Sequence, residues 1–320
     1  MIISITQEKV DAIRLTLERD WPCSRSHASA HEVLSMAGKL LNLTFVVRAG
    51  RYYVWQLLRL TGLHTGHERR KKYKHTAQLG REFHGDVAFW KWAIERRIVQ
   101  AGESLSAPIF AHARQTPVCR YLSDASLEAV GGYCPELNLF GRYTLDPRLT
   151  AEIKEKARRR EIAAITKNFL ELSGMFMTAF VVQTLVGDQP AATGNAILMR
   201  GDNVSAVSWV NRCGGARDRR AGLLMRLLGR LEMENGWCHL AKHIPGIENT
   251  LSDGISRWPE GEVQENVQRL TNDVGWKEID ILDSGRAMFT LFLQNKLPAH
   301  RLDDQMWELI HRRQAGKADS

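Results

Sequence analysis

Four carboxylates in the second half of the chain occupy positions from which they could meet. They are Asp124, Glu171, Asp202 and Asp253, and His243 stands ten residues before the last of them. Like charges a few Å apart repel, so such a cluster cannot stay ionised without cations. Mg²⁺ and Mn²⁺ are the natural partners of an all-oxygen site. The chemistry that this pattern favours is phosphodiester hydrolysis, in which two metal ions about 3.5–4 Å apart hold the attacking and leaving oxygens.

Each of these residues also has a local explanation that involves no metal. Asp124 could begin an Asx-turn after a strand, and Glu171 could complete a capping box at a helix start. Asp202 could cap the next helix, and Asp253 could be a first-turn charge. His243 could be a hydrogen-bonded loop histidine. These alternatives stay open for each residue taken alone, but together they require five coincidences.

The elements that must position these residues follow from the hydrophobic pattern. Short apolar segments predict five strands, at 118–123, 131–134, 139–145, 196–201 and 237–242. Apolar residues at helical spacing predict helices from Asn168 onward, at 205–211 and at 221–234, with a short last helix around Asp253. Residues 146–167 form a charged insert. The order β-β-β-α-β-α-α-β-α predicts an α/β fold, a mixed five-stranded sheet with flanking helices.

The rest of the chain divides around this region. Residues 1–115 are predicted to be mainly helical, with a capping box at Ser29 and Glu32. A basic run at 68–75 is either a solvated surface or a strip that contacts phosphates. Residues 261–320 are predicted to be a helical or partly disordered tail, with helices at 286–295 and 303–313. We therefore expect three parts: 1–115, 118–258 and 261–320.

Bulk properties limit the class of protein. The chain has 320 residues and a net charge of +8, which suits a polyanionic partner without establishing one. Its five cysteines are scattered without a Cys-x-x-Cys pair, a pattern typical of free thiols in a reducing compartment. No apolar run reaches the length of a membrane span. We expect a soluble intracellular protein that has no membrane partner.

Residues 118–258 resemble a type 1 ribonuclease H domain, in the variety found at the carboxyl end of retrotransposon reverse transcriptases. The resemblance rests on several short motifs and one long one. The short motifs are Ser123 to Ser126, Asn168 to Leu172, and Gly201 to Asn203 with Ala206 and Val207. The long motif runs from His243 through Asp253 to Ser256 and Arg257. The long motif is the most specific of the four.

The resemblance implies a role for each matched residue. Two ions of Mg²⁺ or Mn²⁺ would be held by the four carboxylates, Asp124, Glu171, Asp202 and Asp253. His243 would assist proton transfer or product departure, and Asn203 would approach the substrate backbone. The implied reaction is hydrolysis of the RNA strand of an RNA–DNA hybrid by a metal-activated water. Recognition would rest on the 2′-hydroxyls in the wide minor groove.

Residues 1–115 resemble, less specifically, the thumb and connection segments of a reverse transcriptase. The matching pieces are Ala30 to Leu40 and Val46 to Arg51. The polymerase motif Tyr/Phe-x-Asp-Asp does not occur, so DNA synthesis is not expected. The resemblance implies a fragment of a retroelement polyprotein, whose remaining parts would be its partners.

Two other classes compete with a nuclease. The first is a non-catalytic nucleic-acid-binding module that retains the fold. The second is a transposase or integrase, but those proteins use an Asp, Asp, Glu order. Here the glutamate comes second and an aspartate comes last, which disfavours that class.

Overall fold

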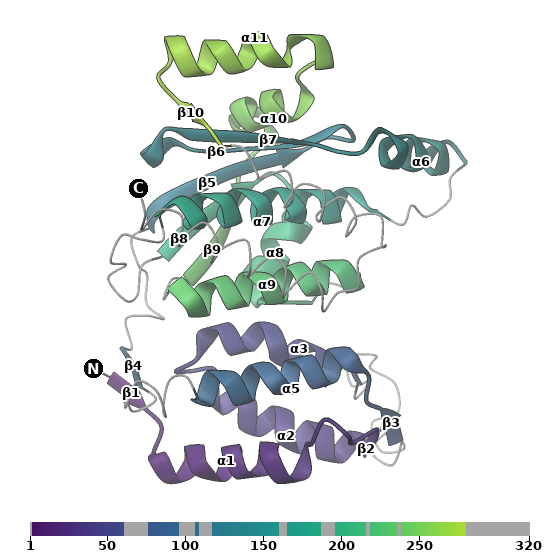
Figure 1. The fold of residues 1–320 in the computed structure, drawn as a ribbon, viewed down its shortest axis with the longest axis vertical. Coiled ribbons are helices and arrows are strands. Elements are labelled where there is room, and N and C mark those ends of the chain that lie inside the picture. The colour runs from purple at the N-terminus through teal and green to yellow at the C-terminus, as the bar shows by residue number, and fades with distance from the viewer. Residues whose placement is uncertain are drawn as a thin grey trace, which may run out of the picture. The chain divides into compact units, whose positions relative to one another are not determined.

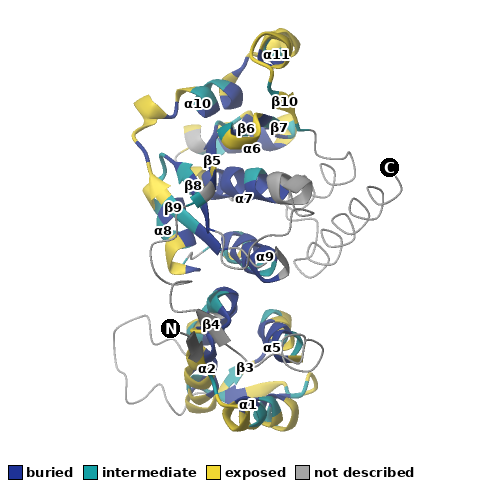
Figure 2. Ribbon diagram, turned by 90° about the vertical axis from the view of Figure 1, so that its left-hand side faces the viewer, coloured by how far each residue is buried: buried dark blue, intermediate teal, exposed yellow. Residues whose placement is uncertain are grey.

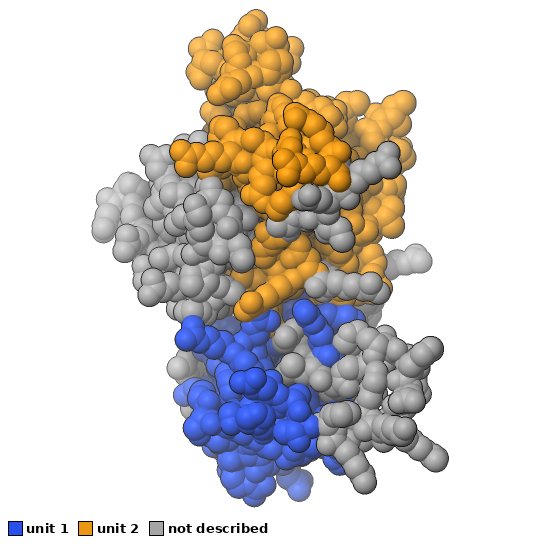
Figure 3. Space-filling view, turned by 90° about the vertical axis from the view of Figure 1, so that its right-hand side faces the viewer, with its two compact units in different colours: residues 1–115 blue, residues 116–320 orange. Residues whose placement is uncertain are grey.

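The structure is a computed structural model that describes residues 2–60, 76–95, 106–108, 117–159, 165–186, 196–215, 218–235 and 238–279. The chain divides into two compact units, Met1–Gln115 and Thr116–Ser320 (Figure 3). The basic run at 68–75 and the helices predicted at 286–295 and 303–313 lie outside the described residues.

Unit 1 is mainly helical, as the sequence predicts. Its helices are α1 (Gln7–Asp20), α2 (Ala30–Leu43), α3 (Arg51–Leu60) and α5 (Arg81–Ile94). Two short antiparallel pairs accompany them: β1 (Ile2–Ser4) with β4 (Ser106–Pro108), and β2 (His27–Ser29) with β3 (Thr76–Gln78). The described part of unit 1 thus contains only short strands beside its helices.

The predicted capping box at the start of α2 is present. The Glu32 backbone N–H donates to the Ser29 hydroxyl (3.2 Å), and the Ser29 backbone N–H donates to the Glu32 carboxylate (2.8 Å). In the core, Trp90 is fully buried, and the rings of Tyr53 and Phe89 stack with their centroids 3.5 Å apart. Aromatic packing of this kind holds α3 and α5 together.

Unit 2 is built on a six-stranded mixed sheet (Figure 1). Its strands are β5 (Pro117–Ala125), β6 (Ala129–Cys134), β7 (Leu139–Thr144), β8 (Ala196–Gly201), β9 (Cys238–His243) and β10 (Lys277–Glu278). Their order across the sheet is β10-β7-β6-β5-β8-β9. The pairs β5–β6 and β6–β7 are antiparallel, and β5–β8, β8–β9 and β7–β10 are parallel. The two central strands are therefore β6 and β5, and side chains on them are well shielded from solvent.

Helices cover both faces of this sheet. The described helices of unit 2 are α6 (Pro147–Arg158), α7 (Lys167–Val186), α8 (Val204–Arg212), α9 (Arg219–Asn235), α10 (Thr250–Arg257) and α11 (Val263–Gln268). A Cβ at Gly131 would meet the Ser256 backbone of α10 at 2.7 Å, and a Cβ at Gly132 would collide with Thr178 of α7. Adjacent strand residues point to opposite faces, so α7 and α10 cover opposite faces of β6. Figure 2 shows the contrast between the buried α7 and the exposed α11.

The prediction of five strands is wrong by one, because β10 extends the sheet beyond β7. The Lys277 backbone N–H donates to the Asn138 carbonyl (2.8 Å), and that of Ile279 donates to the Phe140 carbonyl (2.7 Å). Both residues of β10 are exposed, so this strand has no apolar alternation that a sequence could reveal. Val267 and Leu270, from the predicted tail, pack in the same cluster as Phe140.

Asn168, with which Glu171 could have formed a capping box, does not cap α7. The helix begins at Lys167, and the Thr166 hydroxyl accepts the Phe169 backbone N–H at 3.2 Å. A capping box would then use position 169, so Glu171 has no capping role. The charged insert contains α6, where charged residues four apart form pairs such as Lys156–Glu152.

Candidate metal centre

Asp124 lies inside the central strand β5 and is 1% exposed. Its register partner is Gly131, and the turn that follows is made by Ser126, whose hydroxyl accepts the backbone N–H groups of Glu128 and Ala129. The Asx-turn alternative for Asp124 is therefore not needed. The Ser256 hydroxyl of α10 donates to Asp124 Oδ2 at 2.8 Å and orients this carboxylate.

Glu171 lies in the first turns of α7, on the side that packs against β5, and is 2% exposed. Its Oε1 atom is buried and accepts no hydrogen bond in the described part of the chain. Lys167, one turn earlier and exposed, places its Nζ 3.7 Å from Oε1. A buried carboxylate oxygen that lacks a donor is costly, so a cation at this point would stabilise the folded protein.

Asp202 follows directly after β8, and its neighbour performs the capping function that the sequence allowed Asp202. The Asn203 side-chain oxygen accepts the Ala206 backbone N–H at 3.0 Å, and its amide donates to Asn168 at 2.9 Å. The Asp202 carboxylate is thus left for the carboxylate cluster. Because both polar groups of Asn203 are engaged, its approach to a substrate backbone stays a prediction.

Asp124, Glu171 and Asp202 meet although they come from a strand, a helix and a strand end. Each offers a carboxylate oxygen, and these oxygens lie within 4.8 Å of one another. We name these three residues the acidic trio. Three carboxylate oxygens at this spacing are suitable ligands for Mg²⁺ or Mn²⁺. The Oε1 atom of Glu171, which accepts no hydrogen bond within the described residues, fits that interpretation. The trio can therefore hold a divalent metal ion.

Within the acidic trio, burial and the neighbouring carboxylates disfavour the ionised forms of Glu171 and Asp124. Burial and, to a smaller extent, the carboxylates of Asp124 and Asp202 together raise the pKa of Glu171 to about 8, against the lowering effect of Lys167. Burial also raises the pKa of Asp124, with smaller contributions from Asp202 and Asp253, while the Ser256 hydrogen bond lowers it. A divalent cation would reverse these effects because it favours the ionised form.

Asp253 lies near the trio but outside it. Its carboxylate accepts from the guanidinium of Arg257, one turn later, at 2.6 Å, and its side chain is 42% exposed. Its charge still contributes to the raised pKa of Asp124. The four predicted ligands therefore approach one region, but three of them form the compact group and the fourth faces an arginine.

His243 ends β9 beside Asp202. Its Nε2 lies 2.9 Å from the Asp202 backbone carbonyl oxygen, and because a carbonyl only accepts, Nε2 carries the proton in this contact. The loop that follows continues along Asp202, since a Cβ at Gly246 would lie 3.4 Å from Asp202 Oδ2. The histidine is exposed, so it lies at the solvent side of the trio.

Several residues to which the sequence assigned no role hold α10 against the sheet. The buried Asn249 donates to the Ser123 carbonyl at 3.1 Å, and Ser126 donates to the Ser256 carbonyl at 2.7 Å. Arg142 of β7 reaches the Ile255 carbonyl at 3.0 Å. Asn249 and Ser256 lie in the motif that begins at His243, but a motif does not reveal which of its members bond to the sheet. The pairs Lys167–Glu171 and Asp253–Arg257 have the four-residue spacing that predicts helical contacts.

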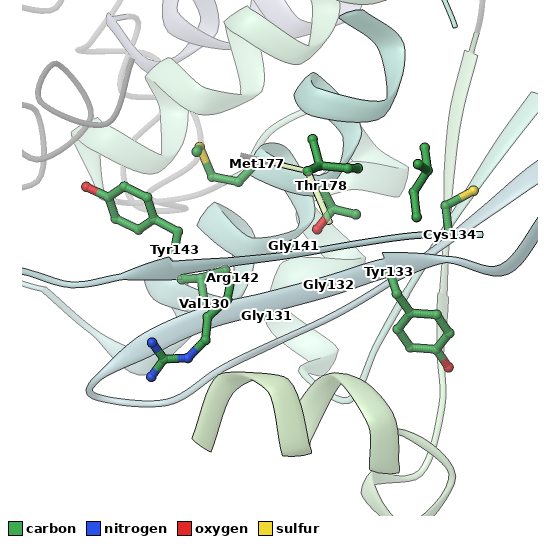
Figure 4. A pocket seen from close by; sticks show the side chains of 12 residues that line it. Val130, Gly131, Gly132, Tyr133, Cys134, Gly141, Arg142, Tyr143, Met177 and Thr178 are labelled. Atoms are coloured by element: carbon green, nitrogen blue, oxygen red, sulfur yellow. The ribbon is translucent and has the colours of Figure 1, made fainter. Parts of the chain in front are cut away.

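A mainly apolar pocket lies beside the trio's sheet, between the β6–β7 hairpin and α7. Figure 4 shows Cys134 and Tyr143 on the side of Met177 and Thr178, and Tyr133 and Arg142 on the other side. None of the trio lines this pocket. It therefore lacks the carboxylates that the chemistry considered above requires.

Comparisons with known proteins give no family for this chain. No protein-family model, no curated protein and no solved structure matches it. Among the described helices, none is long and apolar enough to cross a membrane.

Proposed function

We propose that unit 2 is a metal-dependent nuclease of the type 1 ribonuclease H class, which hydrolyses the RNA strand of RNA–DNA hybrids. The observation that carries this proposal is the meeting of Asp124, Glu171 and Asp202, which are far apart in sequence, within 4.8 Å. Further support comes from the mixed sheet and from the motifs that resemble that class.

The acidic trio would hold Mg²⁺ or Mn²⁺, two ions in all, with Asp253 as the fourth ligand. Such ions supply a water of lowered pKa and neutralise charge at the phosphate during an in-line displacement. For Asp253 to become a metal ligand, its carboxylate would have to release the guanidinium of Arg257 and bind the metal ion instead. Arg257 would then be released, at the edge of the site, to face a phosphate.

The chain's own residues would position the trio and move a proton. Ser256 holds Asp124 Oδ2, and the Asn203–Asn168 hydrogen bond joins the start of α8 to the start of α7, beside Asp202 and Glu171. His243 donates from Nε2 to the Asp202 carbonyl, which leaves Nδ1 to accept a proton. We assign His243 to proton transfer or to product departure.

For the whole chain, we propose a portion of a retroelement reverse transcriptase in which unit 1 is the thumb or connection segment. The support is the motif resemblance at 30–40 and 46–51 and the helical character of unit 1. The partners would be the hybrid duplex and the remaining parts of the polyprotein.

Cleavage of a defined duplex tests the proposal. The purified chain with Mg²⁺ or Mn²⁺ should cut the labelled RNA strand of a hybrid and leave double-stranded DNA intact. Asp124→Asn and Asp202→Asn should each lower the rate about a hundredfold or more, because each removes a ligand charge at nearly constant volume. The exposed Asp273 provides a matched control, and Asp273→Asn should cleave like the wild type.

Three outcomes would contradict the proposal. Equal cleavage by wild type and both trio variants would assign the activity to a contaminant. Binding of the hybrid without cleavage at any metal concentration would favour the non-catalytic binding module. Equal cleavage of hybrid and of double-stranded DNA would assign a different nuclease class.

A further inference from the structure

Cys119 and Cys134 meet in unit 2, although their spacing in the sequence shows no motif. Cys119 belongs to β5 and Cys134 ends β6, and their Sγ atoms lie 2.7 Å apart. Cys134 is fully buried, and Cys119 is 8% exposed. The sequence predicted five scattered thiols, but the fold turns two of them into a pair.

The backbone at this place departs from a regular ladder. Cys134 follows Tyr133, the partner of Leu122, so it stands beside position 121 and diagonal to Cys119. Diagonal residues in a regular antiparallel pair have Cα atoms about 7–8 Å apart, whereas disulfides usually need about 4.4–6.8 Å. Here the ladder between β5 and β6 begins only at Leu122 and Tyr133, the pairing of β5 with its other neighbour β8 is irregular between Pro117 and Cys119, and β6 ends in the turn Pro135–Leu137. These irregular strand ends allow the two thiols to approach each other.

We propose that Cys119 and Cys134 form a dithiol site that closes reversibly to an intramolecular disulfide. The reaction partner is a small-molecule disulfide. Cys119, the more exposed thiol, attacks one of its sulfurs and forms a mixed disulfide, which releases one small thiol. Cys134 then attacks the Cys119 sulfur and releases the second small thiol. The two protein thiols lose two electrons and two protons, which the two released thiols carry away.

A metal site is the competing interpretation of the same residues, because Glu136 also lies nearby. Thiolates that share a tetrahedral zinc ion at about 2.3 Å stand about 3.8 Å apart, well beyond the 2.7 Å between these sulfurs. The Glu136 carboxylate already accepts from the Arg120 backbone N–H (3.1 Å) and from its guanidinium. The observations therefore favour a disulfide over zinc.

The surroundings also bear on the rate of closure. The hydrogen bond between the two thiols and the burial of Cys119 raise the pKa of the Cys119 thiol, so its reaction at neutral pH is slow. A reagent with a good leaving group, such as an aromatic disulfide, therefore suits the test better than an aliphatic one.

The experiment treats the full wild-type chain with dithiodipyridine and follows each cysteine by mass spectrometry. Trypsin cleaves after Arg120, so the pair falls on two peptides, 115–120 and 121–142. The expected product is a cross-link between these peptides, 2 Da lighter than their sum and reversed by dithiothreitol. The exposed Cys23 is the internal control and should retain one half of the reagent.

Two variants and one further measurement complete the test. Cys134→Ser should leave the reagent half attached to Cys119, because no second thiol displaces it, and Cys23→Ser should leave the cross-link unchanged. The oxidised wild type should unfold several degrees higher than the reduced protein, since the bond closes a loop between two strands. Separate adducts on Cys119 and Cys134, no reaction at either, or one zinc ion retained in native mass spectrometry would each overturn the proposal.

Discussion

Replacing Glu171 by glutamine should make the metal-free protein more stable at high pH while weakening its response to Mg²⁺. The Glu171 carboxylate is buried next to two other carboxylates, and its pKa is raised to about 8 from 4.5. A carboxyl group with a raised folded pKa contributes stability that is present below its unfolded pKa. That stability is lost as the pH rises through the folded value. An amide cannot ionise, so Glu171→Gln removes this loss.

The magnitude follows from the two pKa values. Each pKa unit corresponds to about 1.4 kcal/mol, so ionising Glu171 costs the folded state up to about 5 kcal/mol. Between pH 5.5 and pH 8 the group alone should lower the free energy of unfolding by about 3 kcal/mol. The difference between wild type and variant isolates this contribution, because the other titrating groups are common to both.

The assay is urea unfolding followed by far-UV circular dichroism, with EDTA or with Mg²⁺, at pH 5.5 and pH 8. In EDTA the variant should exceed the wild type at pH 8 by about 3 kcal/mol more than it does at pH 5.5. Mg²⁺ should stabilise the wild type and have a much smaller effect on the variant, because a ligand stabilises the state that binds it. The exposed Glu265 supplies the control, and Glu265→Gln should follow the wild type in all four conditions.

Parallel pH profiles for wild type and Glu171→Gln in EDTA would refute this reasoning. They would mean that the folded protein does not hold Glu171 beside the charges of Asp124 and Asp202. Equal stabilisation of both proteins by Mg²⁺ would refute the second part, because the ion would then bind without Glu171.

Three further predictions concern other parts of unit 2. His243→Ala should slow hybrid cleavage but leave the metal concentration for half-maximal rate nearly unchanged. Asp253→Asn should raise that metal concentration. Equal shifts of this concentration in both variants would mean that His243 is a metal ligand. Gly132→Ala should lower the free energy of unfolding by about 1–3 kcal/mol, because the added Cβ collides with Thr178. In urea unfolding, Thr178→Ala should restore part of this loss. An unchanged free energy of unfolding in Gly132→Ala would contradict the close approach of α7. Asn203→Ala should cost about 1 kcal/mol as the lost cap of α8, and an unchanged unfolding midpoint would reject that cap.

The strands of unit 2 were predictable because their residues are apolar and bounded by turns. The segment 196–201 was predicted at the bounds that β8 has, and the segments for β5 and β9 differ by a few residues at their ends. β10 was not predictable. Its two exposed residues join the sheet through backbone hydrogen bonds, which any sequence can make.

The candidate site shows the same limit at the level of single residues. Asp202 and Asn203 are adjacent and both can cap a helix, so the sequence could not decide which of them does; the structure gives the cap to Asn203. The i to i+4 spacing of Asp253 and Arg257 was visible in the sequence. Whether the Asp253 carboxylate faces Arg257 or the acidic trio depends on the orientation of its side chain, which the sequence does not give. Proximity of the trio was expected from the order of the elements, while the burial that perturbs Glu171 depends on packing against β5.

The hydrogen bonds that hold α10 against the sheet have a consequence for folding during synthesis. The hydrogen bonds that hold this helix join Ser126 to Ser256 and Asn249 to Ser123, across more than a hundred residues of chain. During synthesis Asp124 of β5 and Asp202, which follows β8, leave the ribosome before residue 257. Contacts at such separation close late, after the loop-closure entropy has been overcome. A ribosome-bound chain therefore passes through a stage in which the acidic trio can assemble but Asp253 and the hydroxyl of Ser256 are missing, and the candidate metal site is complete only after α10 has formed.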